Sequence, residues 1–509
     1  MLFRSITWGE HDLAANIVHL VLARTPGAPA GTRGISLFVV PKFHVDAAGR
    51  IGARNDVRVV SLEHKLGIMA SPTCVMSFGD NDDCIGELVG HENEGLKAMF
   101  TMMNSARINV GNQGVQIAER ALQQAQYYAR ERVQSARAGS PSKDPVAIIE
   151  HPDVRRMLLR MRAMTEGARA LLYYTAGQVD RGALGIAGAQ ARADCLVPLI
   201  KAWGTDIGCE VASLGVQIHG GMGFIEETGA AQHYRDARIT PIYEGTNGIQ
   251  AADLVTRKLG YEQGEVLCAL LSDVARAAEG RSAELQALAD DCLDVARWMA
   301  GTASLDDKLA GSVPFCTMCA VAVAGWQLLR QVDAAEGALA ASKPVVSRYF
   351  NAHLVPEARG LKAAAVAGAE LLYALDAEAL AWVLGPLAGR IQLRAPMPLA
   401  RFSEQLNQQL TKVPPAEVLE RDEQELAGRV EGEMDRIVTP GRLATDHAQV
   451  ARTGIDRVGG DALEVLLGRV LGHVLVGARG TRPDESVVRH DLRAQEHPIQ
   501  RALAGHGEA

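Results

Sequence analysis

The 509-residue sequence has few aromatic residues, few cysteines and no large excess of one charge. Phe, Trp and Tyr together make up 5% of the residues, and this scarcity beside many Ala–Leu runs favours packed helices over a β-sandwich. The eight cysteines lie mostly in apolar runs. That placement indicates small core side chains in a reducing, cytoplasmic compartment rather than a disulfide framework.

The charges argue against a further class of protein. The formal net charge is −8 and residues of both signs are mixed along the chain, which argues against a nucleic-acid partner. No unbroken apolar run approaches about 18 residues, so we expect no membrane span. Residues 1–12 lack the pattern of a secretory signal. The length allows about two to four domains.

Residues 1–90 predict a small β-domain or part of one. β-rich runs occur at 17–23 and 35–40, on either side of a turn-forming segment at 25–31, and shorter runs occur at 57–62 and 74–78.

The remaining chain has helical periodicity. Helices are predicted over the ranges 96–128, 153–182, 186–214, 262–279, 283–299, 315–332 and 345–375. The first three, joined by short loops, predict an antiparallel bundle spanning 91–260. The others predict a second helical domain over 261–384, and 385–509 is an unassigned, partly helical tail. The expected fold is therefore mainly α, with a partial small β-domain, a bundle and a second helical domain.

One segment stands out chemically. Three glycines follow a long predicted helix in the run 217–224, and they allow a ligand to approach the backbone closely. Further on, Glu244 lies between Tyr243 and Gly245, just before a helix predicted to begin near Gly248. A carboxylate among apolar neighbours could have its pKa raised toward that of a useful general base. The alternative is a Gly-rich turn with a solvated glutamate.

The order of the motifs resembles the acyl-CoA dehydrogenase family over roughly residues 5 to 380. The resemblance rests on the runs 34–40, 65–68, 104–107, 128–132, 217–224, 234–239 and 242–250, together with Gly111 and Gln113. Within that family, the segments 9–12, 63–65 and 100–104 resemble the branch that includes 3-methylmercaptopropionyl-CoA dehydrogenase, in which an additional helical domain follows the catalytic one.

The resemblance implies that FAD accepts a hydride at flavin N5 while a carboxylate removes the α-proton of an acyl-CoA. Glu244 matches this base, and its backbone N–H matches the donor to the thioester carbonyl. The implied FAD contacts are Thr7, Arg132, Gln217, Ile218, His219, Gly220, Gly221, Thr246 and Asn247. Arg132 would meet the pyrophosphate, and 217–221 would hold the adenosine side from a neighbouring subunit. The implied substrate-side residues are Asn104, Arg107 and Gly245.

The resemblance also implies partners. They are an acyl-CoA substrate, an acceptor like electron-transfer flavoprotein, and further copies of the chain in a homodimer or homotetramer. No metal is implied. A lone Cys316–Cys319 pair on an apolar helix is expected to belong to the core, and the run 220–223 does not complete a dinucleotide-binding fingerprint, because Glu226 stands at its last position.

Some positions depart from the family pattern. The chain opens at Thr7 in the middle of the β-domain, and Val133–Gln134 replaces the usual Phe-Gly after Arg132. The glutamine expected on the next helix falls near Pro152. These departures predict an N-terminally truncated chain with an exposed helix face, an unpaired strand edge, little bound FAD and little activity. Two other hypotheses are a non-catalytic helical oligomerisation remnant and a nucleic-acid-binding relative of the fold.

Overall fold

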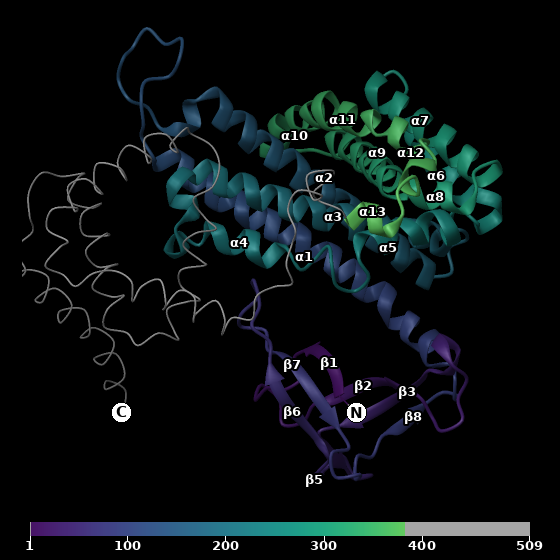
Figure 1. Cartoon of the computed structure of the whole chain (residues 1–509). Coiled ribbons are helices and arrows are strands. Elements are labelled where there is room, and N and C mark those ends of the chain that lie inside the picture. The colour runs from purple at the N-terminus through teal and green to yellow at the C-terminus, as the bar shows by residue number, and fades with distance from the viewer. Residues whose placement is uncertain (1, 382–509) are drawn as a thin grey trace, which may run out of the picture. The chain divides into compact units, whose positions relative to one another are not determined.

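The computed structural model describes residues 2–381 of the chain (Figure 1). The predicted tail from 385 and the charged run 417–436 lie outside the described residues. The strands are β1 (Leu2–Thr7), β2 (Val18–Ala23), β3 (Ser36–Pro41), β4 (Phe43–Val45), β5 (Ile51–Arg54), β6 (Val57–Leu62), β7 (Thr73–Phe78) and β8 (Glu87–Val89).

The strands pair antiparallel in small sheets, in the orders β1-β7-β6, β2-β3-β8 and β4-β5. Val40, Val57, Cys74 and Met76 form the buried core between them. β2, β3, β6 and β7 match the four predicted runs. Within the described residues β2 pairs on one side only, and its Val18 and Leu20 are exposed, which leaves an open, partly apolar strand edge.

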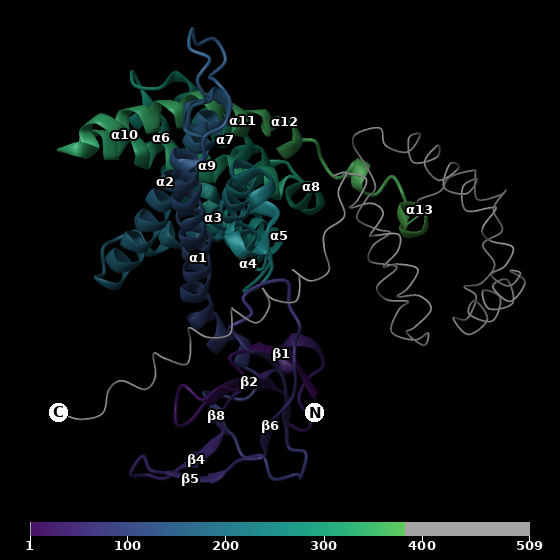
Figure 2. The same cartoon turned by 90° about the vertical axis from the view of Figure 1, so that its left-hand side faces the viewer.

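The helical region begins with three long helices, α1 (Gly95–Glu131), α2 (Pro152–Ala183) and α3 (Ala189–His219), which lie side by side in Figures 1 and 2. The shorter helices α4 (Ala230–Ala237) and α5 (Asn247–Asp253) pack against α3. This confirms the predicted bundle. The third helix begins three residues later than predicted and continues to His219, because apolar positions such as Ile218 remain buried beyond residue 214.

Glycines let α1 and α3 approach very closely. A Cβ on Gly114 would lie 2.3 Å from the carbonyl oxygen of Gly204, and a Cβ on Gly208 would lie 2.9 Å from the Cα of Gly114. Real side chains do not tolerate such distances to backbone atoms, so these positions need glycine for the helices to meet. The contact between these two helices is the most extensive in the described fold.

A second group of helices follows, comprising α6 (Glu265–Ala278), α7 (Ala283–Gly301), α8 (Leu305–Ala310), α9 (Ser312–Asp333), α10 (Ala338–Tyr349), α11 (Val355–Gly360), α12 (Lys362–Ala365) and α13 (Ala377–Ala381). The single helix predicted over 345–375 is wrong. The chain makes a π-helical turn at Phe350–Leu354, and beyond Val366 it forms turns and a short 3-10 helix, Glu370–Leu372, instead of an α-helix. Residues such as Phe350 still keep the apolar spacing of an α-helix, so the sequence pattern gives no sign of the change in helix type.

α9 is the central helix of this second group. Among the described residues it alone is long and apolar enough to cross a membrane, although no unbroken apolar run had suggested one. However, 78% of its most apolar window is buried inside the protein, as in the core helix of a globular domain. Cys316 and Cys319 are buried on α9 as predicted, and burial raises the pKa of Cys316 to about 12.

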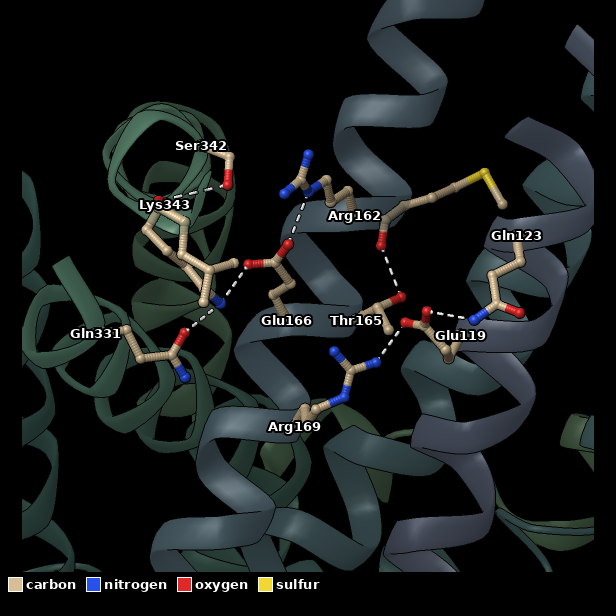
Figure 3. Close-up of polar contacts among 11 residues, drawn as sticks. Glu119, Gln123, Arg162, Thr165, Glu166, Arg169, Gln331, Ser342 and Lys343 are labelled. Atoms are coloured by element: carbon tan, nitrogen blue, oxygen red, sulfur yellow. Dashed lines mark hydrogen bonds and ion pairs between the residues drawn. The ribbon is translucent and has the colours of Figure 1, made fainter. Parts of the chain in front are cut away.

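A polar network joins the bundle to the second helical group (Figure 3). Glu166 on α2 accepts hydrogen bonds from Arg162 at 2.7 Å and from Lys343 of α10 at 2.8 Å. Lys343 also donates to Gln331 of α9 at 2.7 Å. Burial alone would raise the pKa of Glu166, but these two cations hold it below the usual value. Glu166 therefore stays ionised and stabilises the junction.

The glycine contact between α1 and α3 generates a stability prediction. Gly114→Ala should lower the free energy of unfolding by about 1–3 kcal/mol, because the new methyl group meets backbone that cannot move aside. Gly177→Ala is the matched control, since a Cβ on this glycine of α2 would meet nothing within 4 Å. It should raise stability by up to about 1 kcal/mol through helix propensity alone. Urea denaturation followed by circular dichroism measures both, and an equal effect of the two substitutions would contradict the packing argument.

Candidate functional site

The loop between α4 and α5 carries Glu244. Asn247 N–H donates to the carbonyl of Pro241 at 3.0 Å and closes the loop. Glu244 and Gly245 both have positive φ, 55° and 85°. A non-glycine residue rarely adopts this conformation, and such strain is typical of functional sites. The Glu244 side chain is exposed rather than enclosed by apolar neighbours, which corrects the sequence-based expectation. Its backbone N–H makes no hydrogen bond within residues 2–381.

The loop is anchored to α3 by Asn247. Its Oδ1 accepts from Lys201 Nζ at 2.9 Å, and its Nδ2 donates to Asp206 Oδ1 at 2.8 Å and to Ala202 O at 3.0 Å. Lys201 is fully buried. Burial lowers the pKa of Lys201 to about 8 and raises the pKa of Asp206 above its usual value. Thr246 caps α5 by accepting from Ile249 N–H at 3.3 Å, which leaves its hydroxyl proton free to be donated.

Arg107 lies beneath the same loop. It is 4% exposed, and its Nη1 is 3.5 Å from Asp253 Oδ2. Its Nη2 lies 3.8 Å from the position that a Cβ on Gly245 would occupy. Burial lowers the pKa of Arg107, while Asp253 and Glu244 oppose that shift. The guanidinium stays charged, because even a lowered arginine pKa is far above neutral.

Buried polar atoms without partners surround this arginine. Arg107 Nε has no hydrogen-bond partner, and neither polar atom of the Gln250 side chain has one, although Gln250 is fully buried. Buried polar groups are nearly always satisfied in folded proteins. Their accumulation next to Glu244 and Gly245 favours a polar ligand at this place.

Asn104 lies nearby on α1, three residues before Arg107. It lines a cleft of about 450 Å³ together with Phe100, Asp253, Arg257 and Lys258. The structure therefore brings the predicted substrate-side residues Asn104, Arg107 and Gly245 to the same region as Glu244.

Arg132 and residues 217–221, six of the nine predicted cofactor residues, form a second group at the other end of α1. Tyr128 of α1 stacks on His219 of α3 with ring centroids 4.4 Å apart, which places Arg132 and the turn after α3 at the same end of the bundle. His219 Nδ1 is 2.7 Å from the carbonyl oxygen of Gly215. Ile218 is buried in the core, whereas Gln217 is exposed.

The turn itself is open. Gly220 has φ 60° and ψ −138°, a conformation essentially restricted to glycine. A Cβ on Gly220 or Gly221 would meet nothing within 4 Å. Arg132 is exposed and donates to Val133 O and Gln134 Oε1, but it pairs with no carboxylate in the described part of the chain. A free cation and accessible backbone can bind a phosphate group.

The two groups are far apart within one chain. Arg107 lies on α1 and Arg132 directly follows its last residue, 25 positions further on, which corresponds to about 37 Å along the axis at 1.5 Å per residue. Glu244, Thr246 and Asn247 belong to the Arg107 end.

Thr7 lies in the β-domain. It ends β1, is exposed, and is opposite Thr73 of β7. The loop that follows β6 connects the β-domain to the bundle, because Ile68 N–H donates to Asp236 Oδ1 on α4 at 2.6 Å. Two segments that carried the family resemblance, 65–68 and 234–239, therefore touch.

Sequence reasoning missed Lys201, Asp206, Gln250 and Asp253. A signal existed for Lys201, which interrupts an otherwise apolar stretch of α3 between Ile200 and Trp203. A lysine at such a position is rarely buried unless it has a specific partner. No comparable signal marks Gln250, whose environment depends on the loop.

The family model "Acyl-CoA dehydrogenase, C-terminal domain" matches residues 93–259, and "Acetyl-CoA dehydrogenase C-terminal like" matches 266–376. A 3-methylmercaptopropionyl-CoA dehydrogenase of Ruegeria pomeroyi is 52% identical over 351 residues, covering 66% of this chain and 59% of that protein. The broad-specificity linear acyl-CoA dehydrogenase FadE5 of Mycobacterium tuberculosis is 35% identical, covering 68% of this chain and 62% of that protein. The chain thus spans less than two thirds of the length of these relatives.

A solved structure supports the fold. An acyl-CoA dehydrogenase from Bacillus anthracis, solved in complex with FAD, superposes with a TM-score of 0.56 at 22% identity, covering 85% of this chain and 70% of that one. ACDH-11 of Caenorhabditis elegans, solved with C11-CoA, gives a TM-score of 0.55 at 21% identity, covering 66% of this chain and 57% of that one.

The buried lysine beneath the Glu244 loop generates a prediction for pH. Between about pH 8 and its ordinary value of 10.5, Lys201 is deprotonated when folded but protonated when unfolded. The unfolded state then binds the extra proton, so the contribution of Lys201 to the free energy of unfolding rises with pH over this window. In Lys201→Met this rise should disappear.

Urea titrations at pH 8 and pH 10 check this. Buried thiols with raised pKa values act in the opposite direction, so the quantity to compare is the difference between the unaltered protein and the variant. Lys143→Met, in the exposed loop before α2, should behave like the unaltered protein. Parallel pH profiles for the unaltered protein and Lys201→Met would contradict the prediction.

Proposed function

Because this chain belongs to the acyl-CoA dehydrogenase family, we propose that it catalyses the FAD-dependent α,β-dehydrogenation of an acyl-CoA thioester. The observation that carries the proposal is the strained Glu244–Gly245 loop above the buried Arg107. It presents a carboxylate and an unpaired backbone N–H on the same residue, Glu244. We propose residues 91–260 as the domain that holds the site and 261–384 as an additional domain.

Glu244 is the proposed base. Its exposed carboxylate accepts the α-proton of the thioester, and its own N–H donates to the thioester carbonyl, where negative charge develops as that proton leaves. Bound FAD supplies the acceptor for the hydride that leaves the β-carbon. Asn247 and Lys201 hold the loop in place and are positioning residues.

Arg107 supports the base from below. Its buried positive charge interacts favourably with the carboxylates of Glu244 and Asp253. Its Nε and the side-chain amide of Gln250, which have no hydrogen-bond partner, can bond to a polar ligand. Asn104 and Gly245 line the approach of the substrate. The relatives named for 3-methylmercaptopropionyl-CoA and for linear acyl-CoA favour an unbranched acyl group.

The residues of the second group fit a phosphate-bearing cofactor. Arg132 would hold the pyrophosphate of FAD by a charge-assisted contact, and Gln217, Ile218, His219, Gly220 and Gly221 would hold the adenosine side through the open turn. Thr246 can donate its hydroxyl proton to the flavin side, beside Asn247. Thr7 is proposed to lie near flavin N5.

Arg132 lies at the C-terminal end of α1, whereas the Glu244 loop lies over Arg107, far from that end. We therefore propose that each FAD is held by two copies of the chain. A homodimer, or a homotetramer built from two such pairs, provides this arrangement. The proposed electron acceptor resembles electron-transfer flavoprotein, and the proposed location is the cytoplasm.

Glu244→Gln tests the base. The amide keeps the size of the side chain but cannot accept the α-proton, so the flavin of the variant should not bleach under anaerobic acyl-CoA. Flavin content, even if low, and the circular dichroism spectrum should match those of the unaltered protein, whose bound flavin should bleach. Bleaching by the variant at an undiminished rate, or none by the unaltered chain, would contradict the proposal.

Arg132→Ala tests cofactor binding. A charged hydrogen bond contributes about 1.5–3 kcal/mol, so flavin affinity should fall about tenfold or more. Arg130→Ala is the matched control, since Arg130 is exposed two residues earlier on the same helix. Fluorescence titration with FAD measures both. An unchanged Kd for Arg132→Ala would remove this residue from the cofactor site.

A further inference from the structure

A second cleft lies where the bundle meets the second helical group. It has a volume of about 770 Å³ and is formed by α2, the start of α3 and α9. None of the residues that line it belongs to either group described above. Its size suits a small organic ligand, since such sites usually measure about 300–1,000 Å³.

The cleft is positively charged. Arg181, Arg192 and Arg330 line it, and no carboxylate does. Arg192 is paired with Asp273 at 2.7 Å. Arg181 has no ion pair or side-chain hydrogen bond within residues 2–381, and the only side-chain hydrogen bond of Arg330 goes to Gln327. Two of the three cations are therefore not neutralised, which favours an anionic ligand.

Gln327 independently points to a ligand. It is 6% exposed and lines the cleft, and its Oε1 accepts from Arg330 at 2.9 Å. That bond fixes the amide so that Nε2 remains as a buried donor, and Nε2 has no partner. An acceptor oxygen on a bound ligand would satisfy it.

Backbone donors add to this set. Gly188 and Ala189, at the N-terminus of the 31-residue helix α3, line the cleft. Gly188 has φ 73°, and no side chain caps the helix. The N–H of Ala189 donates to Ile186 O at 3.2 Å, so it is the remaining N–H groups of the first turn, together with the positive end of the helix dipole, that favour a phosphate or carboxylate here.

The remaining wall is aromatic. Tyr174 and Trp326 pack edge to face with centroids 5.3 Å apart, and the Arg330 guanidinium lies within 6.0 Å of both rings. Tyr173 is 64% exposed beside them. Flat, accessible aromatic surface next to unpaired cations can bind a ligand that has both a planar ring and an anionic group.

We propose that this cleft binds the phosphate-bearing adenosine moiety of a nucleotide. The ring stacks against the aromatic wall formed by Tyr173, Tyr174 and Trp326, while the phosphate is held by Arg181, Arg330, Gln327 Nε2 and the first turn of α3. Free ADP and the nucleotide end of coenzyme A share this chemistry. The inference does not depend on the proposed dehydrogenase activity.

Titration with ADP, monitored by tryptophan fluorescence because Trp326 lines the cleft, tests the proposal. With the proposed flavin site saturated by FAD, the full chain should bind one ADP, and Arg181→Gln or Arg330→Gln should each weaken binding at least tenfold. Arg156→Gln, on the exposed surface of α2, is the matched control and should leave the Kd unchanged. Arg132→Ala should also leave it unchanged, which separates this cleft from the proposed flavin site.

Further ligands separate the contributions. Adenosine and inorganic phosphate should each bind at least tenfold more weakly than ADP, because each lacks half of the contacts. Coenzyme A that displaces ADP identifies coenzyme A as a source of the ligand, and failure to displace it identifies a free nucleotide; either result supports the site. No ADP binding up to about 1 mM, or ADP binding that Arg132→Ala abolishes and Arg181→Gln does not change, would overturn the proposal.

Discussion

The close contact between α1 and α3 is the constraint on which the described site depends. Gly114 and Gly204 let the two helices meet backbone to backbone. Arg107 lies two turns before that contact on α1, and Lys201 lies one turn before it on α3. The close approach of the two helices therefore sets the distance between the buried Arg107 guanidinium and the Glu244 loop, which Lys201 anchors to α3. A wider separation would move Arg107 away from Gly245 without changing any residue of the loop.

The site is assembled from groups that each cost free energy in isolation. The positive φ of Glu244 is strained, Lys201 is buried, and Gln250 leaves both of its polar atoms without partners. The extensive apolar core of the helices offsets these costs. Such an arrangement is expected where a rigid scaffold holds a loop in a conformation that its own residues do not prefer.

The sequence predicted the long helices well, because apolar residues repeat over many turns in α1, α2 and α3. It also located Glu244 and the open turn at Gly220, through residue order alone. Short strands such as β4 and β5 have too few residues to show the alternating pattern of a strand. The apolar spacing of α10 continues into the π-helical turn Phe350–Leu354, and no residue type in the sequence marks that turn. The environment of Gln250 arises only from tertiary packing.

The burial of α9 has a consequence for folding. Its apolar side chains belong to the same continuous core as those of α2 and α3 in the bundle and α7 in the second helical group. Neither group can detach without exposing a helix that is nearly as apolar as a membrane segment. The two segments matched by separate family models should therefore melt together in one calorimetric transition, although their sequences read as distinct modules.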